Sequence, residues 1–392
     1  MGCRVATLGE LSLDNGKYGI AAPAVDFDTE LPAYLRITDI NDDGALNKLD
    51  RKSVNDPNAC KYMLSEGDIV FARTGNSTGR NYFYDPRDGK FAFAGFLVKF
   101  SLDASKVNPR FVKYYAQSRA YWDWVASFKT GSTRGNINAK TYAQMPIPLP
   151  ERSAQNSIVA LCDCISDKIR VNAQLNGYLL ELAMARFESA LEAESKTVRF
   201  GDIVALEDSK RVPLNSRDRE VRKGPYPYYG ATSVMDHVND YLFDEIRVLL
   251  GEDGTVIDSK GRPILQYVWG KYWVNNHAHI LAPSGEYSLE AIYIALRRTA
   301  INHIVTGAVQ MKISQRNLKS LELEMPSPKS LGYLQDLFAA YRINQDESAK
   351  LAGLRDALLP RLMSGEIDVT KVDLTQLNSH LAEWTTALCY SL

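Results

Sequence analysis

The sequence predicts an α+β protein in which two similar α/β domains are separated by two long helices. Two observations predict this fold: an internal repeat that covers most of the 392 residues, and long helical segments at equivalent places in the two halves. A chain of this length is too long for one ordinary hydrophobic core. Its 45% hydrophobic and 24% charged residues are the proportions of a globular protein.

The repeat is clearest where residues 130–150 align without a gap on residues 306–326, at an offset of 176. Three earlier pairs of segments match at offsets between 179 and 194. They are LGEL at 8–11 with FGDI at 200–203, AYLRITDI at 33–40 with PYYGATSV at 227–234, and GDIVFARTG at 67–75 with IRVLLGEDG at 246–254. In the last pair an apolar, strand-like run stops at a glycine turn. Because the offset drifts, the halves share one framework and differ by insertions within it.

A long helical segment follows each copy of the repeat, and each carries an apolar stripe at spacings of three and four residues. The stripes are Leu161, Ile165, Leu175, Tyr178 and Leu182 in the first segment, and Leu337, Tyr341, Leu351, Leu354 and Leu358 in the second. Polar residues interrupt both stripes at the centre, namely Lys168 and Asn172 in the first and Asn344 and Ser348 in the second. We expect the two helices to pair as an antiparallel coiled coil about 60 Å long. The alternative is that each helix packs only on its own domain.

The predicted organisation therefore has five parts. They are a first domain at 1–150, a central helix at 151–195, a second domain at 196–326, a distal helix at 327–367, and a tail at 368–392 to which we assign no role.

Composition excludes several classes of protein. No apolar run is long enough to span a bilayer, and the start of the sequence lacks the apolar core of a secretory signal. The five cysteines are scattered and odd in number, which favours a reducing cytoplasm. The net charge of −1 argues against a protein that coats nucleic acid nonspecifically. Basic side chains nevertheless gather in two equivalent stretches, 104–140 and 291–321.

The order and duplication of these motifs resemble the specificity subunit of type I restriction-modification enzymes. LGEL, YLRITDI, GDIVFARTG and TGSTRGNI, leading to PIPLP and a long helix, resemble one half of such a subunit. PYYGATSV, RVLLGEDG, TGAVQMKIS and LRDALLPRLMSGEIDV resemble the other half, so that the resemblance covers Val5 to about Val369.

The resemblance implies a subunit without catalytic residues that binds double-stranded DNA at a bipartite site, one half per domain, with the helices fixing the gap. It implies two modification subunits that methylate adenine N6 with S-adenosylmethionine, and restriction subunits that cleave DNA with ATP and Mg²⁺. These cofactors are expected on the partner subunits and not on this chain. The helix stripes are expected to serve helix pairing or partner docking.

Side chains that read bases are expected in glycine-rich loops, because Arg and Lys suit guanine while Asn and Gln suit adenine. The candidates of the first domain are Arg73, Thr74, Asn76, Ser77, Arg80, Lys129, Ser132, Thr133, Arg134 and Asn136. Those of the second domain are Lys260, Arg262, Gln310, Lys312 and Arg316. For each loop an ordinary polar turn is the alternative, since the same residue types form turns.

Two other functions stay open. A metal-dependent nuclease would use Asp208-Ser209-Lys210 or Asp258-Ser259-Lys260, and His277 with His279 could hold a metal on one face of a strand. The sequence lacks a phosphate loop for ATP and the catalytic motif of an adenine methyltransferase. A two-domain module that binds protein or glycan would explain the near-neutral charge without DNA. For Tyr121, Trp122 and Trp124 we favour core packing over base stacking.

Overall fold

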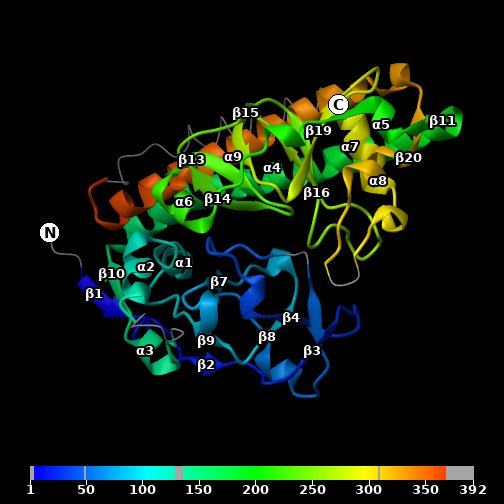
Figure 1. The fold of residues 1–392 in the computed structure, drawn as a ribbon. Helices are drawn as coiled ribbons and strands as arrows, with labels where there is room; N and C mark the ends of the chain where they lie inside the picture. Colours follow the sequence, from blue (N-terminus) through cyan, green and yellow to red (C-terminus); the bar gives the residue numbers. More distant parts are fainter. Residues whose placement is uncertain (1–3, 48–49, 129–135, 308–309, 368–392) are drawn as a thin grey trace. The chain divides into compact units, whose positions relative to one another are not determined.

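The structure is a computed structural model that describes residues 4–47, 50–128, 136–307 and 310–367 (Figure 1). The chain divides into two compact units: unit 1 comprises residues 1–171 and 347–392, and unit 2 comprises residues 172–346. Within the described ranges, no helix combines the length and the apolar character needed to cross a membrane.

Unit 1 contains two four-stranded sheets and a separate strand pair. The first sheet has the order β2 (Lys17–Tyr18), β9 (Leu97–Ser101), β6 (Asp68–Ala72) and β7 (Asn81–Phe83). The second has the order β3 (Ala24–Asp26), β5 (Lys52–Val54), β4 (Ala33–Leu35) and β8 (Phe91–Phe93), in which β4 and β8 are parallel. Strand β1 (Arg4–Thr7) pairs with β10 (Pro146–Leu149), and the short helices are α1 (Pro109–Tyr115), α2 (Arg119–Ala126) and α3 (Ala139–Ala143).

Unit 2 repeats the first sheet and the strand pair of unit 1, and its second sheet keeps the parallel pair but places it between two other strands. Its first sheet has the order β12 (Val204–Leu206), β19 (Ala278–Pro283), β16 (Arg247–Gly251) and β17 (Leu265–Val268). Its second has the order β14 (Val234–Val238), β13 (Lys223–Tyr229), β18 (Lys271–Val274) and β15 (Phe243–Asp244), with β13 and β18 parallel. Strand β11 (Ser195–Arg199) pairs with β20 (Glu322–Pro326), and the short helices are α5 (Phe200–Ile203), α6 (Ser216–Val221), α7 (Leu289–Arg298) and α8 (Gln315–Lys319).

The internal repeat is confirmed down to single hydrogen bonds, as the LGEL and FGDI segments show. The Leu8 amide donates to the Met145 carbonyl at 2.9 Å, and the Phe200 amide donates to the Leu321 carbonyl at 2.8 Å. The glycine that follows each of them lies against a short helix. A Cβ would come within 3.1 Å of the Ala143 carbonyl oxygen at Gly9, and within 3.0 Å of the Lys319 carbonyl oxygen at Gly201. A side chain here would push the short helix away by a few tenths of an ångström, so glycine suits this contact in both copies.

The two long helices are α4 (Arg152–Ala193) and α9 (Tyr333–Met363), and they pack antiparallel (Figure 1). In unit 1, the start of α4 shares a core with the end of α9: Leu161 and Ile165 are buried in one cluster with Leu359 and Leu362. In unit 2, the end of α4 packs with the start of α9, where the Asn176 side chain donates to the Tyr341 carbonyl at 3.1 Å. The predicted antiparallel pair is therefore confirmed.

Three of the polar residues that interrupt the stripes, Lys168, Asn172 and Asn344, contact the opposite helix. In unit 1, Lys168 is buried and its Nζ lies 3.2 Å from Glu347. In unit 2, Asn344 donates to the Asn176 side chain at 2.8 Å, and Asn172 donates to the Asn344 carbonyl at 3.3 Å. These contacts satisfy polar groups that would otherwise destabilise a buried seam.

The predicted stripe of α4 is wrong in its second half. Tyr178 is 65% exposed and Leu182 is 38% exposed, while Leu179, Ala183 and Phe187 are buried. The buried face follows Phe187 because this part of α4 packs into the core of its own domain, beside Phe200, as well as against α9. Leu175 is half-buried.

Helix α9 is also shorter than the predicted distal helix, and Leu354 on it is 49% exposed. Residues Pro328–Leu331 form a 3₁₀ turn, so the α-helix begins only at Tyr333. Leu337 is buried, and Tyr341, Leu351 and Leu358 pack partly buried against the cores. The predicted tail lies outside the described residues.

An ion-pair network in unit 1 ties the segment after β7 to α4. Asp85 contacts Arg87 at 2.8 Å and Arg170 at 3.0 Å, and Arg87 reaches Asp167 at 3.1 Å. Burial raises the pKa of Asp85, but the hydrogen bonds from Arg87 and the charge of Arg170 outweigh it and lower the pKa to about 2.

We expect Asp85→Asn to lower the melting temperature at neutral pH. The folded pKa lies below the ordinary value of 3.8, so Asp85 stabilises the fold above pH 3.8 and this contribution is lost as the pH falls toward about 2. Melting curves of both proteins between pH 7 and pH 2 should converge over that window. The control is Asp26→Asn, which removes a carboxylate that is 99% exposed in its pair with Lys52. An equal loss of melting temperature in the two variants would contradict the stabilising role of the Asp85 ion pairs.

Candidate DNA interface

The end of β6 brings together two of the predicted segments of the first domain. The Arg73 amide donates to the Phe96 carbonyl at 3.1 Å, and the Arg73 carbonyl accepts from the Ile137 amide at 2.9 Å. Thr74 forms an antiparallel bridge with Asn136. The loop after β6 and the segment from Asn136 therefore lie side by side.

Unit 2 repeats this arrangement at the end of β16. The Ile313 amide donates to the Glu252 carbonyl at 2.9 Å, and Asp253 forms an antiparallel bridge with Lys312. Strand pairing makes Glu252 the counterpart of Arg73, because β6 and β16 hold the same place in matching sheets. The same framework thus presents different side chains in the two domains.

The other candidates of the first domain differ in accessibility. Asn76 is exposed and Ser77 is buried. Arg80 is held within the protein, since its Nε lies 2.7 Å from Asp42 and its Nη1 donates to the Ile40 carbonyl at 3.2 Å. The candidates Lys129, Ser132, Thr133 and Arg134 lie outside the described residues.

In the second domain the candidates lie in two segments, the turn at 258–262 and the segment at 310–316. Lys260 is exposed, and Arg262 is paired with Asp258 at 2.7 Å in the same turn. Gln310 and Arg316 are exposed, and the Lys312 ammonium lies 3.4 Å from Glu252. Only Lys312 is thereby placed at the strand end that corresponds to Arg73.

The two basic stretches are partly neutralised by acids. Arg110 lies 3.2 Å from Asp163, and Arg298 lies 2.8 Å from Glu188. Lys113 is buried enough that desolvation lowers its pKa. The number of basic residues alone therefore does not mark a DNA-binding face.

A buried polar cluster underlies the strand end of unit 2. His279 Nδ1 lies 2.6 Å from Asp208, and His279 Nε2 lies 2.8 Å from the Ile313 carbonyl oxygen. Asp208 also accepts from the Ile280 amide at 2.9 Å and from Gln315 at 2.5 Å. Burial raises the pKa of Asp208, but the bonds with His279 and Ile280 lower it more, so the pKa lies below its usual range.

Asp208, Glu252 and His279 place possible metal ligands within 4.8 Å of one another. Their ligand atoms already face protein partners, because Arg211 binds Glu252 at 2.6 Å and His279 is engaged at both ring nitrogens. His277 turns instead to Asp253 at 2.7 Å, so the two histidines do not converge. This arrangement favours a hydrogen-bond network that supports the loop.

The nuclease tripeptides are not assembled as such a site needs. Lys210 contacts Glu207 at 2.6 Å and not Asp208, and Asp258 is engaged by Arg262. Of the three aromatics on α2, Tyr121 is buried in the core, while Trp122 and Trp124 pack against it partly buried.

Comparison with known proteins identifies the family. The family model described as the type I restriction modification DNA specificity domain matches residues 9–179 and again residues 192–351, which together are most of the chain. The chain belongs to this family. The two matches also divide the sequence as the internal repeat does.

Individual relatives of this specificity-domain family are distant. The type I restriction enzyme HindI specificity subunit of Haemophilus influenzae is 24% identical over 165 residues, which are 40% of this chain and 36% of that protein. Another Haemophilus influenzae protein is 26% identical over 32% of this chain and 31% of its own length, so the chain matches about a third of these relatives. The type I restriction enzyme MjaIX specificity subunit of Methanocaldococcus jannaschii is 21% identical over 68% of this chain and 71% of that protein.

A solved structure supports the fold. The crystal structure of the S subunit of a type I restriction-modification system from M. genitalium matches 92% of this chain and 96% of its own, with 17% sequence identity and a TM-score of 0.52. This likeness concerns the fold alone.

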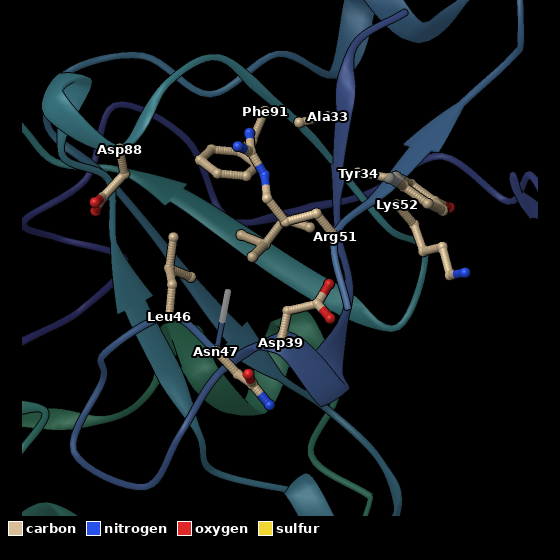
Figure 2. Close-up of a pocket in the computed structure, with 10 residues that line it drawn as sticks. Ala33, Tyr34, Asp39, Leu46, Asn47, Arg51, Lys52, Asp88 and Phe91 are labelled. Atoms are coloured by element: carbon tan, nitrogen blue, oxygen red, sulfur yellow. The ribbon is translucent and has the colours of Figure 1, made fainter. Parts of the chain in front are cut away.

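A small hollow of this specificity-domain protein lies in unit 1, between the second sheet and its loops (Figure 2). Arg51, Lys52, Asp39 and Asp88 line it together with Phe91. Its volume is about 60 Å³, whereas sites for drug-sized ligands enclose roughly 300 Å³ or more. The hollow is too small to hold a nucleobase or a nucleotide cofactor.

Sequence reasoning missed two aromatic residues beside Arg73. Tyr18 and Phe96 place their rings next to its guanidinium, with centroids 5.1 and 5.9 Å from the central carbon. Both side chains are more than 40% exposed. Little in the sequence indicated the position of Phe96. This residue lies in the run FAFAGFLVKF, whose alternation predicts a strand. The pattern does not show that a turn between β8 and β9 exposes the Phe96 ring.

Proposed function

We propose that this chain is the DNA-specificity subunit of a type I restriction-modification complex, in which each domain reads one half of a bipartite double-stranded site. The proposal rests on one observation. The two domains have the same backbone arrangement after β6 and after β16, but they place different side chains there. Arg73 and Asn136 stand in the first domain where Glu252 and Lys312 stand in the second. A shared framework with different side chains is what two readers of different sequences require. The membership of the specificity-domain family supports it.

The chemistry in this proposal belongs to partner subunits. Two modification subunits methylate adenine N6 with S-adenosylmethionine, and restriction subunits use ATP and Mg²⁺ to cleave DNA. The relatives from Haemophilus influenzae and Methanocaldococcus jannaschii carry the name of specificity subunits of type I restriction enzymes, which supports this division of labour. The proposed place of action is the cytoplasm, where the DNA of a prokaryotic cell lies.

The near-neutral charge fits a reader that depends on its partners for affinity. Phosphate contacts supply most of the strength of DNA binding, and in this chain 47 acidic residues offset 46 basic ones, for a net charge of −1. We therefore expect tight, specific binding by the complex with the modification subunit and weak binding by this chain alone.

Selection from a random DNA library tests the proposal. The chain is mixed with the proposed modification subunit from the same organism, and bound duplexes are amplified and sequenced over several rounds. The expected result is enrichment of two short motifs at a fixed spacing, which the methyltransferase alone does not enrich. Failure of the complex to enrich any sequence would contradict the proposal and leave the module that binds protein or glycan.

A further inference from the structure

Arg73 is held at its backbone more firmly than the other candidate arginines of the loops. Its amide donates to Phe96 across the sheet edge, and its carbonyl accepts from Ile137. The residue follows directly on β6, which is buried along its whole length. The backbone from which the Arg73 side chain extends is therefore fixed.

Two aromatic side chains flank this guanidinium. Its central carbon lies 5.1 Å from the centre of the Tyr18 ring and 5.9 Å from that of Phe96. The Tyr18 hydroxyl accepts from the Ala139 amide at 3.1 Å, which fixes that ring in turn. Tyr18 is 44% exposed and Phe96 is 56% exposed, so both rings lie at the surface. Rings at this distance attract a cation and restrict the plane of an arginine side chain.

Among the residues that the structure describes, no acid or carbonyl accepts a hydrogen bond from the Arg73 side chain, and its Nε is buried without a partner. Arg80, Arg87 and Arg262, by contrast, are each paired with an aspartate. Because the buried Nε cannot be reached from outside, an outside ligand would bind the two terminal nitrogens, which no described protein group engages.

We propose that Arg73 reads a guanine of the first half-site, with Tyr18 and Phe96 holding its guanidinium in the plane of the base. This inference rests on the proposed function and names one contact by which the first domain would read its half-site. A planar guanidinium donates two parallel hydrogen bonds to O6 and N7 of guanine, a geometry that no other base offers in the major groove.

The contact is confined to one domain. In unit 2 the equivalent position is Glu252, which binds Arg211 at 2.6 Å and lies 3.4 Å from Lys312. A carboxylate held in this way cannot make the same contact with guanine. The second half-site is therefore an internal control for any change at Arg73.

The test measures methylation by the complete complex on duplexes in which single guanines of the first half-site are replaced by 7-deazaguanine, which lacks the N7 acceptor. With the wild-type chain, one replacement should slow methylation roughly 10- to 100-fold, the range of a bidentate base contact. Arg73→Lys replaces two coplanar donors with one point charge, so it should slow methylation of the unmodified site by a similar factor and lose most of the sensitivity to 7-deazaguanine at that position.

The matched control is Arg51→Lys, since Arg51 also lies over a ring, that of Phe27 at 4.4 Å. This variant should keep the full sensitivity to 7-deazaguanine. If Arg73→Lys reduces the yield of folded complex, Phe96→Ala serves in its place. This variant should methylate the guanine and the 7-deazaguanine duplexes at more similar rates than the wild type does.

Three results would overturn the inference alone: unchanged sensitivity at every guanine in Arg73→Lys, an equal loss at both half-sites, or a loss that is the same for all sequences, as expected for a phosphate contact. A wild-type complex without sequence preference would overturn the proposed function together with the inference.

Discussion

Asp208→Asn is expected to lower the free energy of unfolding of unit 2 by about 3 kcal/mol and to abolish reading of the second half-site. Removing one partner from a buried, hydrogen-bonded pair leaves the other without compensation, which costs about this much. Asp208 is buried and engages His279, Ile280 and Gln315. Through the bond from His279 to the Ile313 carbonyl, it holds the segment that carries Lys312 against β19.

Urea unfolding and methylation of half-site variants measure the two effects of Asp208→Asn. The matched control is Asp240→Asn in the same unit, which changes an exposed carboxylate whose contact with the Tyr241 amide an asparagine oxygen can keep. The control should change stability far less and leave the second half-site intact. An Asp208 variant as stable and as selective as the control would refute the supporting role of the cluster.

Phe71→Ala is expected to destabilise unit 1 by about 3 to 5 kcal/mol, the usual cost of emptying the space of a buried phenylalanine. Phe71 is completely buried, and its ring stacks on that of Tyr142 with centroids 4.8 Å apart. A loss of this size is comparable with the whole stability of many domains. Reading of the first half-site should therefore fail.

Thermal unfolding compares Phe71→Ala with Phe96→Ala, which truncates the same side chain at a position that is 56% exposed. The second variant should retain nearly the wild-type melting temperature. Similar losses of melting temperature in the two variants would contradict the burial of Phe71 in the core of unit 1.

The repeat could be predicted from the sequence because its constraints are local. The glycines of LGEL and FGDI lie in a contact that leaves little room for a Cβ, and prolines and glycines mark the turns. The seam of α4 was predicted less well. Its second half follows Phe187 into the domain core, and a stripe counted along the helix cannot show which of two packing partners decides the buried face.

The candidate site was predictable only in part. Arg73 stood out because a glycine-rich loop follows a strand, but Tyr18 and Phe96 reach it from distant parts of the sequence. The link between Asp208 and His279 joins residues 71 positions apart, so only the fold reveals it. Arg80 and Arg262 fit the same loop pattern as Arg73, yet nearby aspartates engage them.

The central claim is that two like domains read two half-sites. A genome-wide map of methylated adenines, made in cells that carry the gene and in cells that lack it, tests this claim most directly. The account predicts a bipartite motif with a fixed unspecified gap, whose methylation disappears when the gene is deleted. Methylation that is unaffected by the deletion, or that depends on the gene but follows one continuous motif without a gap, would contradict it.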